Sequence, residues 1–342
     1  MLALVWLFFC DIVGVRSISC RLSVMRLLKR LLCALNRCLL ITGSLLVIGC
    51  QPASEPPLRI GSNVWAGYEP LYLARELELY AANSVALKEL NSSTETLRAF
   101  RQGQLDIAAL TLDEVLRLSG QIDDLQILLV TNISNGADKI ISRPGINSIA
   151  ELKGKRIAVE ENSVGIYLLY QALQSAGLNL NEVDLVPSTI NQQLHLMQSF
   201  LADALVTFDP TAYKLQKQGF TTLLDSTQID HKIVDVLVCR KLLLAERPQA
   251  VSQFLDTYWQ AHTVLLDSPQ TAYPYIAARL HVETTSLPAL YQNLIMPDKA
   301  MNSRLMTEDM AEIINNTADF LLQQGLLQTQ PDAASLLGHK AS

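Results

Sequence analysis

The sequence predicts an α/β fold in two lobes, each a small sheet flanked by helices, with extra helices at the C-terminal end. Three observations lead to this fold class. From Leu58 onward, short β-type runs alternate with amphipathic helical runs, which is typical of largely parallel sheets. The same alternation starts again after Gly154, and residues 248–342 read almost wholly as helices. At 342 residues the chain is long enough for two domains.

The elements of the first cycle follow from their residue types. Clusters of branched and other apolar residues predict strands at 58–64, 85–90, 106–112 and 124–132. Apolar residues at 3- and 4-residue steps predict a helix over 70–80. The next helix is expected to begin at Ser92, because Ser92 and Glu95 have the spacing of a capping box.

The second cycle repeats this order. By the same criteria, strands are predicted at 156–161, 183–187, 202–209, 220–226 and 233–240. Between them, helices are predicted over 163–176, ended by Gly177, and around 190–201. The helices after residue 248 carry apolar faces and are expected to cover the sheet of the first lobe.

The first 49 residues read as a secretory signal. A basic section (Arg26, Lys29, Arg30 and Arg37) precedes an apolar stretch over 38–48, which is shorter than the roughly 20 residues that a spanning helix needs. Residues 1–24 hold a further apolar patch that fits no signal plan well. We therefore hypothesise that translation begins at Met25.

The signal ends in Val47-Ile48-Gly49-Cys50, which resembles the lipobox of bacterial lipoproteins. The resemblance implies cleavage before Cys50, acylation of that cysteine, and a periplasmic or extracytoplasmic protein that is lipid-anchored to a membrane. The alternative is a hydrophobic run that happens to contain a cysteine. Residues 50–57 are rich in Pro and Ser and are expected to serve as a tether.

Charge and cysteine content narrow the function classes. The chain has 27 Lys+Arg and 33 Asp+Glu, of which six and one precede Cys50, so the mature chain carries a net charge of −11. An acidic surface without a basic stripe argues against nucleic acid as a partner. Only Cys50 and Cys239 remain after cleavage, so no disulfide framework is expected.

Two predicted strands end in the same local pattern, Thr111-Leu112-Asp113 and Thr207-Phe208-Asp209. In open α/β sheets the ligand crevice lies beyond the carboxyl ends of the strands, so both units are predicted to face a cleft between the lobes. Helix capping is an alternative reading of each aspartate, and it does not exclude exposure to the cleft.

Three stretches together resemble a known family: residues 64–75 (VWAGYEPLYLAR), 134–138 (SNGAD) and 233–238 (IVDVLV). They are similar to the solute-binding proteins of ABC importers for sulfonates, nitrate, taurine and the thiamine pyrimidine precursor, the SsuA/NMT1-like family. The similarity runs from about residue 58 to 327.

This resemblance implies a two-lobed type II periplasmic-binding-protein fold with a hinge. We expect lobe 1 to comprise 58–142 plus 236–342 and lobe 2 to comprise 143–235, with crossovers near 139–146 and 236–242. The resemblance also implies that a small-molecule solute binds between the lobes and that the closed form docks on an ABC permease in the inner membrane. We expect a monomer without cofactor or metal.

The candidate binding residues lie after strands or at helix starts on the predicted cleft side. Trp65 would provide a flat apolar wall. Ser93 and Thr94 begin a helix, where free N–H groups suit an anion, and Asn162 and Ser163 do so in the second lobe. The predicted ligand-binding set is Trp65, Ser93, Thr94, Thr111, Asp113, Asn135, Asp138, Glu160, Asn162, Ser163, Phe208, Asp209 and Asp235.

The acids in this set indicate the class of solute. Asp113, Asp138, Glu160, Asp209 and Asp235 are all predicted to face the cleft, and no Arg or Lys is expected to join them. Like charges in a dry cleft cost several kcal/mol, so the set favours an amine, an aminopyrimidine or a zwitterion. A sulfonate, taurine or nitrate is the alternative.

Two other functions compete with solute transport. Pyrimidine synthases of thiamine biosynthesis share the implied fold, but their activity is associated with a cysteine-rich cluster, and the mature chain has two cysteines. The five histidines lack metal-ligand spacing, and no nucleotide-binding motif occurs. We therefore expect no enzymatic activity. The second alternative, a receptor that reports solute binding to a membrane signalling partner, is not excluded by the sequence.

Overall fold

The computed structural model describes residues 26, 29–31, 33–34, 55–161 and 163–338. The chain divides into two compact units, Met1–Glu55 and Pro56–Ser342. In the first unit, the described residues between 26 and 34 are helical. None of the helices within the described ranges combines the length and apolarity needed to cross a membrane. Most of the predicted signal, Cys50 and residues 51–54 of the tether lie outside the described residues.

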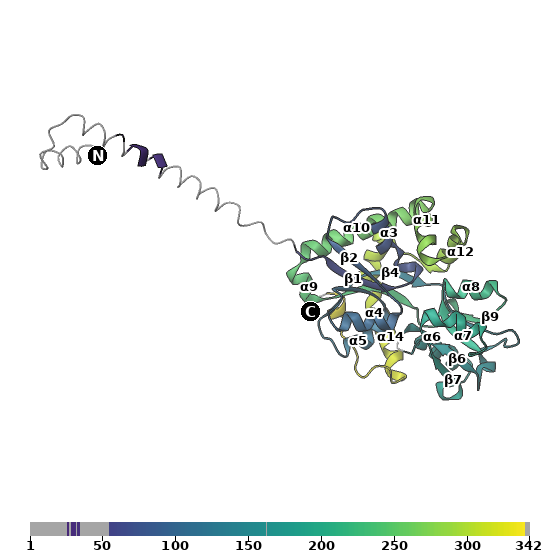
Figure 1. The fold of residues 1–342 in the computed structure, drawn as a ribbon. Helices are drawn as coiled ribbons and strands as arrows, with labels where there is room; N and C mark the ends of the chain where they lie inside the picture. Colours follow the sequence, from purple (N-terminus) through teal and green to yellow (C-terminus); the bar gives the residue numbers. More distant parts are fainter. Residues whose placement is uncertain (1–25, 27–28, 32, 35–54, 162, 339–342) are drawn as a thin grey trace, which may run out of the picture. The chain divides into compact units, whose positions relative to one another are not determined.

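The second unit contains two sheets (Figure 1). The first has six strands in the order β11-β4-β10-β3-β1-β2. β1 is parallel to β2 and β3, whereas β10 is antiparallel to β3 and β4, and β11 is antiparallel to β4. The bounds are β1 Leu58–Asn63, β2 Val85–Leu90, β3 Ile107–Thr111, β4 Leu125–Ser134, β10 Val234–Arg240 and β11 Leu294–Ile295.

The second sheet has five strands in the order β7-β6-β8-β5-β9. β6 is parallel to β7 and β8, and β5 is antiparallel to both β8 and β9. The bounds are β5 Asp138–Ser142, β6 Arg156–Val159, β7 Asp184–Pro187, β8 Ala204–Phe208 and β9 Thr221–Asp225.

The chain crosses between the sheets earlier than we expected. We assigned 138–142 to lobe 1, but β5 is an inner strand of the second sheet, where Ile140 and Ile141 are fully buried. The chain therefore passes from the first sheet to the second over 135–137. It returns before Val234, because β10 already pairs with β4 from that residue.

The helices account for most of the remaining chain (Figure 1). Their bounds are η1 Ala66–Tyr68, α3 Glu69–Glu76, α4 Ser93–Arg101, α5 Leu112–Ser119, α6 Val164–Ser175, α7 Ile190–Gln198, α8 Thr211–Lys217, α9 Lys241–Glu246, α10 Pro248–Asp267, α11 Pro269–Leu280, α12 Leu287–Gln292, α13 Lys299–Arg304, α14 Met310–Gln323 and α15 Ala333–Leu336. The helix predicted over 70–80 ends at Glu76, and Glu78 adopts a left-handed φ of 55° that a helix cannot continue through.

The first sheet is covered on both faces, which explains its almost uninterrupted apolar strands. In β3, Ile107 and Ala109 pack with α3, α10 and α11, whereas Ala108 and Leu110 pack with α4, α5 and α14. Side chains alternate between the faces of a strand, so a strand between two helical layers needs apolar residues at every position. The C-terminal helices α10, α11 and α14 supply part of both layers, as predicted.

Candidate functional site

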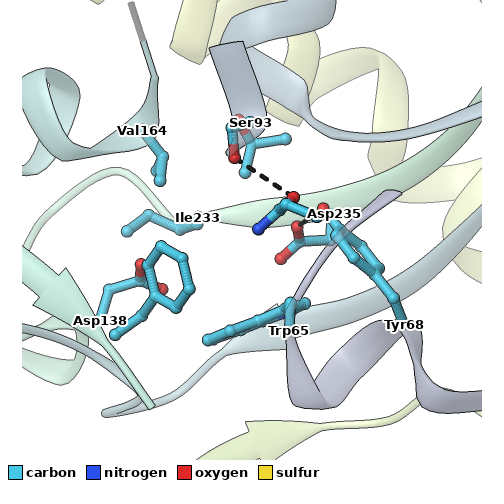
Figure 2. A pocket seen from close by; sticks show the side chains of 10 residues that line it. Trp65, Tyr68, Ser93, Asp138, Val164, Ile233 and Asp235 are labelled. Atoms are coloured by element: carbon cyan, nitrogen blue, oxygen red, sulfur yellow. Dashed lines mark hydrogen bonds between the residues drawn. The ribbon is translucent and has the colours of Figure 1, made fainter. Parts of the chain in front are cut away.

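A small cavity lies where the two sheets approach each other (Figure 2). Its volume is about 10 Å³, roughly the room for one water molecule. Residues of both sheets and of the segments that follow their strands contribute to it. The lining residues are Asn63, Trp65, Tyr68, Ser93, Thr111, Asp138, Val164, Phe208, Ile233 and Asp235.

Two aromatic rings close one side of the cavity. Trp65 follows β1, Phe208 ends β8, and the rings meet edge to face with centroids 5.1 Å apart. The indole Nε1 of Trp65 donates to Asn132 Oδ1 at 3.3 Å, which fixes the ring on the first sheet. Gly67 allows this approach, because a Cβ there would lie 2.0 Å from the Asn132 amide.

Asp235 lies in β10, directly opposite Thr111 of β3. The hydroxyl of Tyr68 donates a hydrogen bond to Asp235 Oδ1. The carboxyl is almost completely buried, and burial raises its pKa well above the usual range. The neighbouring acids Asp138 and Glu114 raise it further. Burial therefore disfavours ionisation of Asp235, and a positive charge brought next to it would favour the ionised form.

Asp138 begins β5 and lies opposite Phe208 of β8. It is 4% exposed, and its Oδ2 has no hydrogen-bond partner among the described residues. Burial raises the pKa of this carboxyl to about 7, although Ser134 and Lys139 lower it in part. A buried carboxylate oxygen without a partner is costly, so a donor brought by a solute would relieve that cost.

Glu114 adds a third buried acid behind the lining residues. Its Oε2 accepts a hydrogen bond from Thr111 N at 3.0 Å, which caps α5, whereas its Oε1 has no partner in the part of the chain that the structure describes. Burial raises its pKa to about 8, and Asp113 adds to the effect. None of the described residues that line the cavity is Lys or Arg.

The expectation that no Arg or Lys joins the acids was wrong for Asp113 and Asp209. Asp113 pairs with Arg117 at 2.9 Å, one helical turn along α5. Asp209 pairs with Lys139 at 3.1 Å, because the second residue of β5 lies beside β8. Neither aspartate lines the cavity. The cap of α5 is Thr111, not Asp113.

Glu160 and Thr94 do not line the cavity, but they meet beside Ser93, which does. Glu160 directly follows β6, and its Oε1 accepts a hydrogen bond from Thr94 N at the start of α4, at 2.8 Å. Ser93 does line the cavity and donates to Asn63 Oδ1 at 3.3 Å (Figure 2). Ser163 caps α6 by accepting from Gly165 N.

The structure thus brings together six of the predicted residues: Trp65, Ser93, Thr111, Asp138, Phe208 and Asp235. Asn135 is exposed and does not line the cavity, and Asn162 and Cys50 lie outside the described residues. Sequence reasoning missed four lining residues, Asn63, Tyr68, Val164 and Ile233. Tyr68 and Ile233 belong to the stretches that carried the family resemblance, which was the available signal for them.

The profile of the NMT1-like family matches residues 51–280 of the chain. A binding protein of Brucella abortus (strain 2308) is 24% identical over 196 residues, which are 56% of this chain and 58% of that protein. The chain thus spans less than two thirds of that relative. The taurine-binding periplasmic protein of Escherichia coli (strain K12) is 24% identical over 269 residues, 75% of this chain and 84% of that protein.

Among solved structures, the alkanesulfonate-binding protein SsuA from Xanthomonas axonopodis pv. citri, bound to MOPS, matches with a TM-score of 0.68 at 19% identity, over 82% of this chain and 98% of that one. The desulfurization enzyme DSZB matches with a TM-score of 0.61 at 18% identity, over 82% of this chain and 97% of that one. These likenesses confirm the predicted two-lobed periplasmic-binding-protein fold.

Proposed function

Because the chain belongs to the NMT1-like family, we propose that it is the solute receptor of an ABC importer. It would act outside the cytoplasm, as a monomer tethered to a membrane through an acylated Cys50, and would deliver its solute to a permease. The two-sheet fold supports this role, since such receptors hold a solute between two lobes that close over it. The name of the Escherichia coli relative, a periplasmic binding protein, supports it as well.

The solute that the site favours is a cationic nitrogen compound, such as an amine or an aminopyrimidine. The carboxyls of Asp138 and Asp235 carry this proposal, because they are buried in a cavity whose lining, within the described ranges, contains no Lys or Arg. An ammonium or amidine group would donate to the unpartnered Asp138 Oδ2 and favour ionisation of both acids. Trp65 and Phe208 would contribute cation–π attraction.

Solute binding requires the cleft to open. A cavity of about 10 Å³ holds no organic solute, whereas binding sites for small molecules occupy hundreds of Å³. The two crossovers are suited to a hinge, because Ser226 Oγ lies 2.7 Å from both Ser134 Oγ and Gly136 N and so ties one crossover to the other. Gly136 adopts a φ of 108°, which few other residues tolerate.

Taurine, a sulfonate or nitrate is the second candidate class, because the names of two relatives point to it. Taurine carries an ammonium group that would suit the acids. Its sulfonate would need a positively charged donor, and the described residues that line the cavity include no lysine or arginine. A receptor for a signalling partner would use the same cleft.

Enzymatic activity is the least supported candidate, although an enzyme shares the fold. Cys239 is the described cysteine of the second unit, and it lies buried in β10 away from the cavity lining. Burial raises its pKa to about 12, so the thiol is a poor nucleophile at neutral pH.

A thermal-unfolding screen of the purified protein tests the proposal. The probes are ethylamine, 4-aminopyrimidine, taurine, ethanesulfonate and nitrate, and a ligand at 100 times its Kd stabilises by about 2.7 kcal/mol. We expect a shift with a cationic nitrogen compound that is lost in Asp138→Asn and retained in Asp123→Asn, an exposed acid outside the cavity. A shift with ethanesulfonate alone would keep the receptor role and refute the cationic solute.

A further inference from the structure

The start of α4 is occupied by a side chain from the other half of the cleft. α4 has nine residues and is capped by Ser92, whose Oγ accepts from Glu95 N at 3.2 Å. A second donor of the first turn, Thr94 N, donates to Glu160 Oε1 at 2.8 Å. Thr94 belongs with the first sheet, whereas Glu160 follows β6 of the second sheet.

Glu160 is held in place by its own segment. Its backbone carbonyl accepts from both Ser163 N at 3.3 Å and Ser163 Oγ at 3.0 Å, at the start of α6. The residue is 8% exposed. The carboxylate therefore reaches across the cleft from a fixed backbone, and its place at the helix start is set by the fold of the second sheet.

A helix start of this kind is where a protein binds the anionic end of a small molecule, because its N–H groups and dipole favour negative charge. In this chain the carboxylate of Glu160 already holds that position in the closed cleft. A sulfonate brought to the same donors would have to displace Glu160, or lie beside it and repel it. The contact thus disfavours one class of solute without disfavouring cations.

We propose that Glu160 determines the charge selectivity of this receptor by taking the place of a solute's anionic group at the start of α4. The inference rests on the proposed function, a cleft that closes over a solute. It goes further in naming the residue that excludes sulfonates and nitrate. The acids Asp138 and Asp235 attract a cation, whereas Glu160 acts against an anion, so the two effects are separable by substitution.

The test compares Glu160→Gln with the wild type in calorimetric titrations with ethanesulfonate and with ethylamine. Gln keeps the side-chain length and an oxygen that can accept from Thr94 N, but it carries no charge. We expect ethanesulfonate to bind at least about tenfold more tightly to Glu160→Gln than to the wild type, while ethylamine affinity changes little. Glu161→Gln is the matched control, because Glu161 is the exposed neighbour, and it should behave as the wild type.

The outcomes separate this inference from the proposed function. One outcome is that the wild type binds ethylamine, while folded Glu160→Gln and Glu160→Ala bind ethanesulfonate no more tightly than the wild type does. This outcome would refute the role of Glu160 and would still support the receptor function. Tighter binding of ethanesulfonate by Glu160→Gln, without binding of ethylamine by any variant, would support the role of Glu160 and refute the cationic solute. If neither the wild type nor the variants bind any probe, both the proposed receptor function and the role of Glu160 are refuted.

Discussion

Trp65 and Phe208 meet edge to face, with ring planes at 87° and centroids 5.1 Å apart, although 142 residues separate them in the chain. Trp65 is fixed on the first sheet by Asn132, and Phe208 ends a strand of the second. The pair therefore joins the two halves of the cleft directly beside the buried carboxyl of Asp138. The same contact that closes the cavity also forms its apolar wall.

Phe208→Leu is expected to weaken solute binding without unfolding the protein. Leu preserves an apolar side chain but loses the aromatic contact with Trp65, which is worth about 0.5–1.5 kcal/mol beyond its buried area. We expect the Kd of a bound solute to rise about 2- to 12-fold. Isothermal titration calorimetry measures this change in Kd.

The control for this substitution is Phe200→Leu. Phe200 is 71% exposed in the turn after α7 and is not one of the residues that line the cavity. An equal loss of affinity in both variants would contradict the role of the Trp65–Phe208 pair.

Asp138 is expected to make the stability of the solute-free protein depend on pH. Burial raises the pKa of this carboxyl to about 7, so the folded state prefers the protonated form. The resulting stabilisation is fully present below about pH 4, the unfolded value, and is lost as the pH rises through about 7. Asp138→Asn cannot ionise. At pH 8 it should be more stable than the wild type by on the order of 4 kcal/mol, because the difference of about three between the folded and unfolded pKa values is almost fully expressed there, and at pH 4 it should differ little.

Urea unfolding at the two pH values measures this difference. The exposed Asp123→Asn should show no such dependence. If Asp138→Asn shifts the free energy of unfolding equally at pH 4 and pH 8, titration of Asp138 is not the cause. The same variant should lose affinity for a cationic solute, so a gain in stability would accompany a loss of function.

The sequence was sufficient for elements whose signal is local. Alternating and continuous apolar runs located the strands except β5 and β11, which were not predicted. The rule that crevices follow strand ends placed Thr111 and Phe208 at the cavity. The sheet that a strand joins is not a local property. β5 reads as a short apolar run that either sheet would accept, and its pairing with β8 brings Lys139 to Asp209.

Contacts between residues that are distant in the sequence could not be predicted, for the same reason. Tyr68 lies in a single 3₁₀ turn before α3, and its hydroxyl meets a carboxyl 167 residues away only because β10 lies beside β3. The contact between Thr94 and Glu160 likewise depends on how closely the two halves approach. Residue types identified Thr94 and Glu160 as site candidates. The sequence pattern alone could not show that the Glu160 carboxylate accepts a hydrogen bond from Thr94 N.

Removal of either partner of the Lys139–Asp209 ion pair is expected to destabilise the second sheet strongly. The two residues are 5% and 2% exposed, and Asp209 Oδ2 also accepts from Asn293 Nδ2 at 3.2 Å. Loss of one member leaves a buried charge without its counterion, which costs about 3–5 kcal/mol. Lys139→Met and Asp209→Asn should each lower the free energy of unfolding by about that amount.

The double variant Lys139→Met with Asp209→Asn provides the control for this pair. It removes both charges, so its loss of stability should be clearly smaller than the sum of the single losses. Urea unfolding of the four proteins measures the coupling. Additive losses would mean that the two charges do not stabilise each other.

Tyr68→Phe tests the hydrogen bond to Asp235 with the smallest possible change. The variant keeps the ring and removes the donor to Asp235 Oδ1, so a buried acceptor loses its partner at a cost of about 1–3 kcal/mol. The pKa of Asp235 should also rise further, because the hydrogen bond from Tyr68 lowers it. Urea unfolding measures the cost, and Tyr275→Phe, at a residue 41% exposed, is the control and should change stability little. If Tyr68→Phe is as stable as the wild type and binds the same solutes with the same affinity, the hydroxyl of Tyr68 positions nothing in the cleft.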